Sequence, residues 1–160
     1  MAIAKVDITC KDCGCTFTHR KSCHSRPEAD DYERWASRNI TICPECNHKH
    51  RVAAMVDTLK QHGFALPELT GVSDKQIAYA QSVRERYLLD NLNRVDKYRR
   101  FQGRLNDAEQ MAQLAQVCTE QGTTVEDAIN EYKRSMGFDT MQIMLTSANA
   151  GEILDAHAHH

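Results

Sequence analysis

Apolar and polar positions alternate at the start of the chain and follow helical spacing after it. The alternation over Ala2–Thr9 predicts a short strand, and Thr16–Thr18 predicts a second strand that returns as a hairpin. Gly63 is predicted to end the last helix of this region. The other elements predicted here are a helix over 27–37, a strand over 39–42 and a helix over 48–61.

After Gly63 the apolar pattern is helical almost throughout. Residues 63–72 contain Pro67 and Gly71 and predict a linker, and Ser73 is a predicted N-cap with Gln76 as its capping-box partner. The spacing of apolar residues then predicts a long helix over 74–101. Shorter helices are predicted over 106–120, over 124–136 with Thr123 or Thr124 as cap, and over 140–156.

Two Cys-x-x-Cys pairs, Cys10/Cys13 and Cys43/Cys46, are the clearest chemical motif. Each pair places two thiolates on one tight turn, and Gly14 follows the first pair where such a turn needs a positive φ. Four soft thiolates form a closed tetrahedral site, which is typical of structural zinc. We therefore expect one Zn2+ that stabilises the fold and leaves no open position for catalysis.

Three neighbouring residues are alternative ligands, because Cys15, Cys23 and His48 could each replace one of the four thiolates. The sequence has no third paired turn to support a second ion. Cys118 lies on an apolar helix face and is expected to be a small buried side chain. A second ion would also need nearby histidines, namely His19, His24 and His50.

These elements predict an α+β fold that is mostly α. Residues 1–62 would form a small zinc ribbon, built from a β-hairpin and short helices, and the linker over 63–72 would join it to an α-helical bundle over 73–157. Aromatic residues make up only 6% of the chain, so the core is expected to be mainly aliphatic and rich in alanine.

Composition adds expectations about compartment and charge. The chain of 160 residues has no N-terminal signal-peptide pattern and no apolar run near the ~18 residues of a membrane span, so we expect a cytoplasmic protein without membrane contact. In that reducing compartment, paired cysteines indicate metal and not disulfides. Residues 1–104 hold 18 Lys/Arg and 13 Asp/Glu, whereas residues 105–160 hold 2 and 9. This polarity indicates a basic face for a partner, or uneven charge on solvated helices.

Two parts of the chain resemble uncharacterised zinc-ribbon proteins of bacteria and their phages or mobile elements. The first comprises residues 26–36 and 39–46; the second comprises 66–71 and 73–80. The second part is similar to a recurring capped helix with the pattern TG-SEKQIAWA-IR, in which Tyr79 here stands in place of Trp and Val72 is an extra residue. The resemblance covers about residues 8–90 and implies a fold but no activity.

The segment 39–49 is also similar to the closing half of zinc-supported HNH nucleases. By this resemblance His24 would activate water, Asn39 would orient the site, and His48 or His50 would hold a divalent ion. The residues that precede His24 and follow Cys46 depart from the family pattern. A nuclease is therefore the least favoured interpretation, and no other catalytic constellation is present in the sequence.

Two groups of basic residues predict binding to nucleic acid. In the second group Tyr98 and Phe101 are interleaved with the cations and could stack on bases. The alternative is that both rings pack into the helical core while the arginines are solvated. The first group flanks the cysteines and consists of Arg20, Lys21, Arg26, Lys49 and Arg51; the second consists of Arg94, Lys97, Arg99, Arg100 and Arg104.

We interpret the chain as a non-enzymatic zinc-ribbon binding protein of a bacterium or phage. Its expected partner is nucleic acid or a nucleoprotein complex, and no small-molecule substrate is expected. The alternative is a protein-binding inhibitor of a bacterial defence complex, of the anti-CRISPR kind. Residues 107–131 contain six acids and no Lys or Arg, so they could compete for a nucleic-acid channel.

Overall fold

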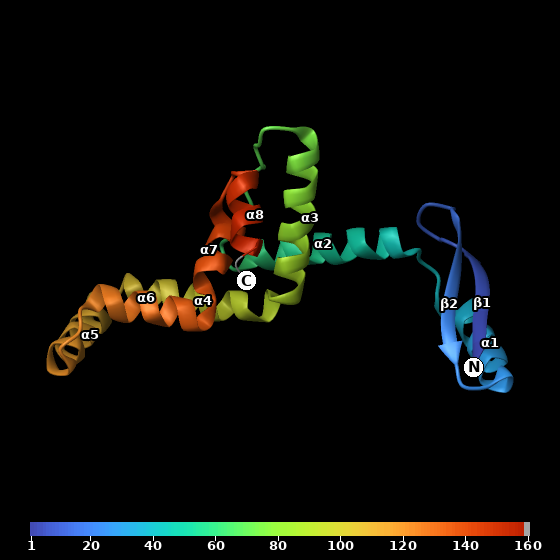
Figure 1. The fold of residues 1–160 in the computed structure, drawn as a ribbon, viewed down its shortest axis with the longest axis horizontal. Coiled ribbons are helices and arrows are strands. Elements are labelled where there is room, and N and C mark those ends of the chain that lie inside the picture. The colour runs from blue at the N-terminus through green and yellow to red at the C-terminus, as the bar shows by residue number, and fades with distance from the viewer. Residues whose placement is uncertain (159–160) are drawn as a thin grey trace. The chain divides into compact units, whose positions relative to one another are not determined.

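The computed structural model describes residues 1–158, which form two compact units that divide between Ala53 and Ala54. The first unit contains a two-stranded antiparallel sheet and a helix, and the second is helical (Figure 1). The predicted mostly helical α+β class is confirmed. The division falls inside helix α2 (Pro44–Gln61), whereas the predicted boundary was at residue 62.

The first unit begins with the predicted hairpin. Strand β1 (Ala2–Thr9) matches the predicted bounds, and β2 (Thr16–Cys23) is longer than predicted and pairs with β1 along its whole length. Ala4 and Ile8 are buried on one face, as the alternation of side chains in a strand requires. The hairpin therefore has one face covered by protein and one face in solvent.

Helix α1 (Arg26–Asn39) covers the inner face of the hairpin. Ser25 caps the helix by accepting a hydrogen bond from the Glu28 N–H at 3.4 Å, and Pro27 lies at its start, where the missing N–H costs nothing. Ala29 packs with Ala4 and Cys23 in a small core. Small side chains at this contact let the helix lie close to the strands.

The strand predicted over 39–42 is wrong. Asn39 is the last residue of α1, and the three residues after it have no strand partner. The segment makes one contact of the strand type, in which the Lys11 N–H donates to the Thr41 carbonyl oxygen at 2.9 Å. A single bond of this kind holds the segment beside the hairpin turn but does not continue the sheet.

The second unit contains the end of α2 and six further helices within the described residues (Figure 1). Helix α8 packs against α3 and α7, and α7 also contacts α4 and α6, so α7 lies at the centre. The fully buried side chains around it include Leu88, Met141, Met144, Leu145 and Ile153. The six helices are α3 (Asp74–Asp90), α4 (Leu92–Leu105), α5 (Ala108–Gln121), α6 (Val125–Met136), α7 (Phe138–Thr146) and α8 (Ala150–Ala158).

The core of this unit has an aromatic part that the composition did not indicate. The ring of Phe138 lies 5.3 Å from that of Tyr98 and 5.3 Å from that of Phe101, and Tyr132 lies 6.0 Å away. These are ordinary distances for edge-to-face and tilted aromatic pairs. The aliphatic core predicted from composition is therefore present around α3 and α8, and aromatic rings fill the junction of α4, α6 and α7.

Two helices predicted as continuous are each broken in two. Asn91 ends α3, where its side-chain amide donates to the Tyr87 carbonyl oxygen at 2.9 Å. The predicted helix over 140–156 is interrupted at Ser147–Asn149, where the Asn149 side chain accepts from the Gly151 N–H at 2.8 Å. Asn and Ser compete with helical hydrogen bonds through their short polar side chains, which apolar spacing alone does not register.

The segment predicted as a linker is packed into the second unit. The Thr70 N–H donates to the Ala148 carbonyl at 2.7 Å, and the Ala150 N–H donates to the Thr70 carbonyl at 2.8 Å. Leu69 beside them is buried. The predicted cap of the next helix is confirmed, because Ser73 accepts from the Gln76 N–H at 3.2 Å and Gln76 reaches back to the Val72 N–H.

Candidate metal centre

Four cysteine side chains of the first unit converge. The sulfur atoms of Cys10, Cys13, Cys43 and Cys46 all lie within 4.8 Å of one another, and those of Cys13 and Cys43 are 3.8 Å apart. Cys10, Cys43 and Cys46 are buried, whereas Cys13 is exposed. The predicted set of four is therefore assembled from two segments that are thirty residues apart, and it could hold a metal ion.

The hairpin turn places the first pair. The Cys10 N–H donates to the Cys15 carbonyl oxygen at 2.8 Å, and the Gly14 N–H donates back to the Cys10 carbonyl oxygen at 3.0 Å. Gly14 has φ 72°, the left-handed conformation predicted for it, which a residue without Cβ adopts at low cost. The turn thus closes tightly and directs both thiols to one side.

The start of α2 places the second pair. Cys43 directly precedes the helix and Cys46 lies in its first turn, where the Asn47 N–H donates to the Cys43 carbonyl at 2.9 Å. The Cys43 N–H also points at the Cys10 sulfur, 3.2 Å away. One backbone amide of the second segment therefore contacts a thiol of the first, which links the two pairs directly.

The environment of the sulfurs favours thiolates in the first pair. Backbone N–H groups, that of Cys43 foremost, lower the pKa of Cys10 to about 6, and the Cys15 N–H lowers the pKa of Cys13. Hydrogen bonding to neighbouring thiols has the opposite effect on Cys46 and Cys15. It raises the pKa of Cys46, and it raises the pKa of Cys15 to about 12. Thiolates at this spacing repel each other, so a cation among them would be strongly stabilised.

The alternative ligands differ in position. The Cys15 sulfur is 3.3 Å from that of Cys13 and stays at the edge of the centre. Cys23 pairs with Ala2 at the far end of the hairpin and is buried against α1, so it does not reach the cluster. His48 is exposed and outside the four-cysteine set. Cys118 is buried on α5, as predicted.

The basic residues that flank the cysteines fall into two classes. Arg26 pairs with Asp30 at 2.7 Å, and Lys49 pairs with Glu45 at 2.8 Å. The other three are exposed, and in the described part of the chain they form no ion pair with an acidic side chain; they are Arg20, Lys21 and Arg51.

The second basic group does not carry stacking rings. Tyr98 and Phe101 are only 1% and 9% exposed, so the alternative that both rings pack into the helical core is confirmed and neither ring is available to stack on bases. Their spacing, together with that of Val95, places them on the buried face of α4, whereas Arg99 and Arg100 are exposed. Asp96 pairs with both Arg99 and Arg100, which offsets part of the positive charge. Arg94 donates to the Asn91 side chain at 3.0 Å; Lys97 and Arg104 are exposed.

The residues of the nuclease resemblance are not brought together. His24 precedes α1 and Asn39 is its last residue, so the length of the helix, about 20 Å, separates them. The Asn39 side chain donates to the Trp35 carbonyl at 2.8 Å, and His50 contacts the Asp12 carboxylate at 2.8 Å. The arrangement gives no common site for water activation.

The structure reveals an aromatic surface that the sequence analysis did not assign to a site. Trp35 is 51% exposed, whereas Ala36 beside it on α1 is fully buried. Its ring lies against that of Tyr32, with centroids 5.4 Å apart. The Lys21 Nζ atom lies over the Tyr32 ring, 4.3 Å from its centroid. The single tryptophan of the chain, close in sequence to basic residues, is the signal that could have indicated this surface.

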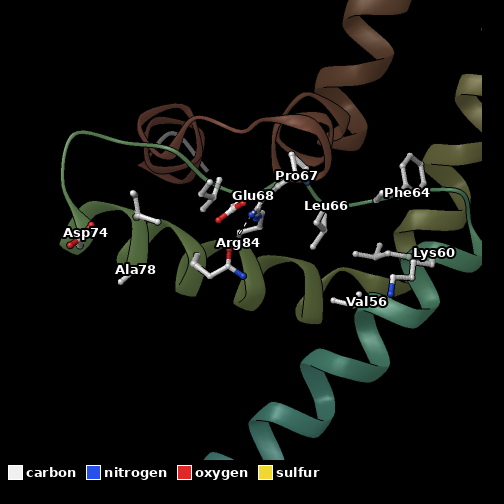
Figure 2. A pocket seen from close by; sticks show the side chains of 14 residues that line it. Val56, Lys60, Phe64, Leu66, Pro67, Glu68, Asp74, Ala78 and Arg84 are labelled. Atoms are coloured by element: carbon white, nitrogen blue, oxygen red, sulfur yellow. Dashed lines mark hydrogen bonds between the residues drawn. The ribbon is translucent and has the colours of Figure 1, made fainter.

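The second unit contains a cavity of about 630 Å³ between the end of α2, the segment 64–69 and α3 (Figure 2). Arg84 lies in its wall with only 2% of its surface exposed. Its guanidinium donates to the carbonyl oxygens of Pro67 at 2.9 Å and Ser147 at 3.3 Å and to the Gln81 side chain at 3.0 Å. The cation thus fixes the wall of the cavity, and its burial lowers the pKa of Arg84.

Comparison with known proteins identifies no relative of this chain. No family model matches the chain, and no curated protein or solved structure matches it significantly. Among the described helices, none is long and apolar enough to cross a membrane.

Proposed function

We propose that Cys10, Cys13, Cys43 and Cys46 bind one Zn2+ in a zinc-ribbon-type centre. The observation that supports this is the convergence of four sulfur atoms within 4.8 Å. Zinc–sulfur bonds of about 2.3 Å in a tetrahedron separate the sulfurs by about 3.8 Å, so little movement is needed to complete the geometry. With four protein ligands the ion has no open position, and its role is to stabilise the fold.

Elemental analysis of the purified protein tests this assignment. We expect one equivalent of zinc in the wild type, less than one tenth of that in Cys46→Ser, and a full equivalent in the matched control Cys15→Ser. Equal metal loss in both variants would assign Cys15 a ligand role. Absence of zinc from the wild type would remove the proposal.

We further propose that the first unit binds nucleic acid and is not an enzyme. The observation that carries this is a set of exposed cations without acidic partners in the first unit: Arg20 and Lys21 on β2, and Arg51 on α2. Exposed cations of this kind contact phosphates and release the counterions condensed on the nucleic acid, which gives binding without a catalytic group. A cytoplasmic location in a bacterial cell agrees with a reduced thiolate site.

Salt-dependent binding to mixed DNA or RNA fragments tests the proposal. Lys21→Glu and Arg51→Glu should each weaken binding and reduce the slope of log K against log salt by about 0.7–0.9 per lost phosphate contact. Arg100→Glu is the matched control, because Asp96 already pairs with Arg100. An equal loss in the control would move the interface to α4, and no salt dependence in the wild type would refute nucleic-acid binding.

The acidic helices of the second unit favour a second candidate function, the inhibition of a nucleoprotein complex. Glu109, Glu120, Glu126 and Glu131 are exposed on α5 and α6, and residues 107–131 contain no Lys or Arg. A negative surface of this kind can occupy a basic channel in place of nucleic acid. Recovery of a single bacterial nucleic-acid-binding complex, lost when these four residues are changed to Gln, would support inhibition over direct binding.

A further inference from the structure

Trp35 is the single tryptophan of the chain, and half of its side chain faces solvent on helix α1. Tryptophan is highly buried on average, so a half-exposed indole offers an unusually large apolar surface to a partner. One side of the indole leans on Tyr32, with ring planes inclined at 34°. The remaining surface of the ring has no cover within the first unit.

The residues that support Trp35 are fixed before any ligand arrives. The Tyr32 hydroxyl and the His19 Nε2 atom are 2.8 Å apart, and the two rings are 5.8 Å apart. Tyr32 also packs against the buried cluster of Ala4, Cys23 and Ala29. A preorganised ring loses little conformational entropy on binding, which is the condition for a stacking site.

Two cations belong to the surface around this pair of rings. Lys21 lies over Tyr32, and Arg38 follows Trp35 by three residues, which makes the two side chains neighbours on the helix surface. No acidic side chain pairs with either cation among residues 1–158. Asp31, one turn before Trp35, is already paired with Arg34. We call His19, Lys21, Tyr32, Trp35 and Arg38 the aromatic platform.

We propose that the aromatic platform binds single-stranded nucleic acid by stacking an unpaired base on Trp35. This inference rests on the nucleic-acid binding proposed above and deepens it by naming the strand state. The flat indole offers a face to any base, and the flanking Lys21 and Arg38 contact the phosphates on either side. A duplex keeps its bases stacked inside, so it offers phosphates but no base face for Trp35.

Tryptophan fluorescence tests the proposal directly, because every change in emission reports Trp35. Titration with a mixed-sequence single-stranded oligonucleotide should quench the emission and saturate with the binding curve. The duplex of the same sequence should leave the emission unchanged. Quenching by the duplex to the same extent, or binding of the single strand without any change in emission, overturns the stacking proposal.

Variants measured with a labelled oligonucleotide separate stacking from charge. Trp35→Ala should weaken single-strand binding about tenfold, and Trp35→Phe should retain most of it, because stacking of one base is worth that order of affinity. Tyr79→Ala is the matched control, since Tyr79 is an aromatic residue of α3 that is 60% exposed. Metal content and far-UV circular dichroism establish that the variants are folded.

The outcomes distinguish this inference from the function on which it rests. If Trp35→Ala binds as tightly as the wild type while Arg51→Glu, which lies outside the platform, does not, nucleic-acid binding stands and the platform does not. If no oligonucleotide binds at any salt concentration, both proposals fail.

Discussion

At the scale of single residues, the buried Arg84 side chain connects distant segments of the second unit. Its guanidinium bonds to the carbonyl oxygens of Pro67 and Ser147, which come from the segment before α3 and the turn after α7. Hydrogen bonds to a charged group are worth about 1.5–3 kcal/mol each.

Arg84→Met should therefore destabilise the second unit. The methionine fills part of the volume but donates no hydrogen bond, so we expect the free energy of unfolding to fall by about 3 kcal/mol. Arg86→Met is the control, because Arg86 is exposed two residues later on the same helix. Chemical denaturation monitored by circular dichroism measures both variants, and equal stability of the two would contradict the role given to Arg84.

Asp107 links the stability of α5 to pH. Its carboxylate accepts from the N–H groups of Gln110 and Glu109, and these bonds, that of Gln110 first, hold the pKa of Asp107 below its ordinary value. The stabilising effect of this cap is complete above the ordinary carboxyl pKa and is lost as the pH falls through the lower, folded-state pKa. The charge also interacts favourably with the helix N-terminus.

An NMR titration checks this cap. We expect the carboxyl carbon of Asp107 to titrate below the ordinary aspartate range and the amide shifts of Gln110 to follow it. Asp107→Asn keeps a capping side chain without a titrating group, so its α5 amides should show no transition at that pH. An ordinary titration of Asp107 in the wild type would contradict the hydrogen bonds described.

Among the elements, the junction before α3 depends on close packing at one glycine. A Cβ atom added to Gly71 would lie 2.9 Å from the Gln76 side-chain oxygen and 3.1 Å from the Ala150 Cβ atom. Gln76 is held in place there, because its oxygen accepts from the Val72 N–H. The glycine of the Thr70-Gly71 pair is therefore required for a steric reason, since only a residue without Cβ lets this segment lie so close to α8.

Gly71→Ala should lower the free energy of unfolding by about 1–3 kcal/mol through overpacking. Gly103→Ala should raise it by about 0.5–1 kcal/mol, because Gly103 lies in α4 with open space around a Cβ and alanine is the better helix former. Thermal unfolding of the two variants measures both changes, which should have opposite signs. A stabilising Gly71→Ala would show that the segment moves away from α8 in solution.

At the scale of the whole molecule, the two units have different sources of stability. Residues 1–53 have a core of small side chains and four buried cysteines, whereas the second unit buries large aliphatic and aromatic residues. A domain of some fifty residues has little apolar core of its own, and the proposed Zn2+ would supply the missing stability.

Chelation of the metal should therefore unfold the first unit selectively. Hydrogen exchange should accelerate throughout β1, β2 and α1, while α3, α7 and α8 keep their protection and most of the helical circular dichroism remains. Added zinc should restore the protection of the first unit. Unchanged exchange in β1 after the metal is removed, or loss of protection in both units together, would contradict independent stability.

The sequence by itself determined the local features. The alternation over Ala2–Thr9, the caps at Ser73 and Thr124, and the positive φ of Gly14 all follow from the chemistry of adjacent residues. The cysteine spacing predicted the four members of the candidate metal centre, because each pair is placed by its own turn. These properties need no knowledge of distant parts of the chain.

Tertiary structure decided which surface each side chain occupies. Tyr98 and Phe101 have the spacing of a basic aromatic helix, yet contact with Phe138 from α7 buries them. Trp35 has the spacing of a core residue, yet the hairpin accepts Tyr32 and leaves Trp35 in solvent. Exposure depends on which elements pack together, and packing is set by contacts between residues far apart in sequence, which local pattern does not contain.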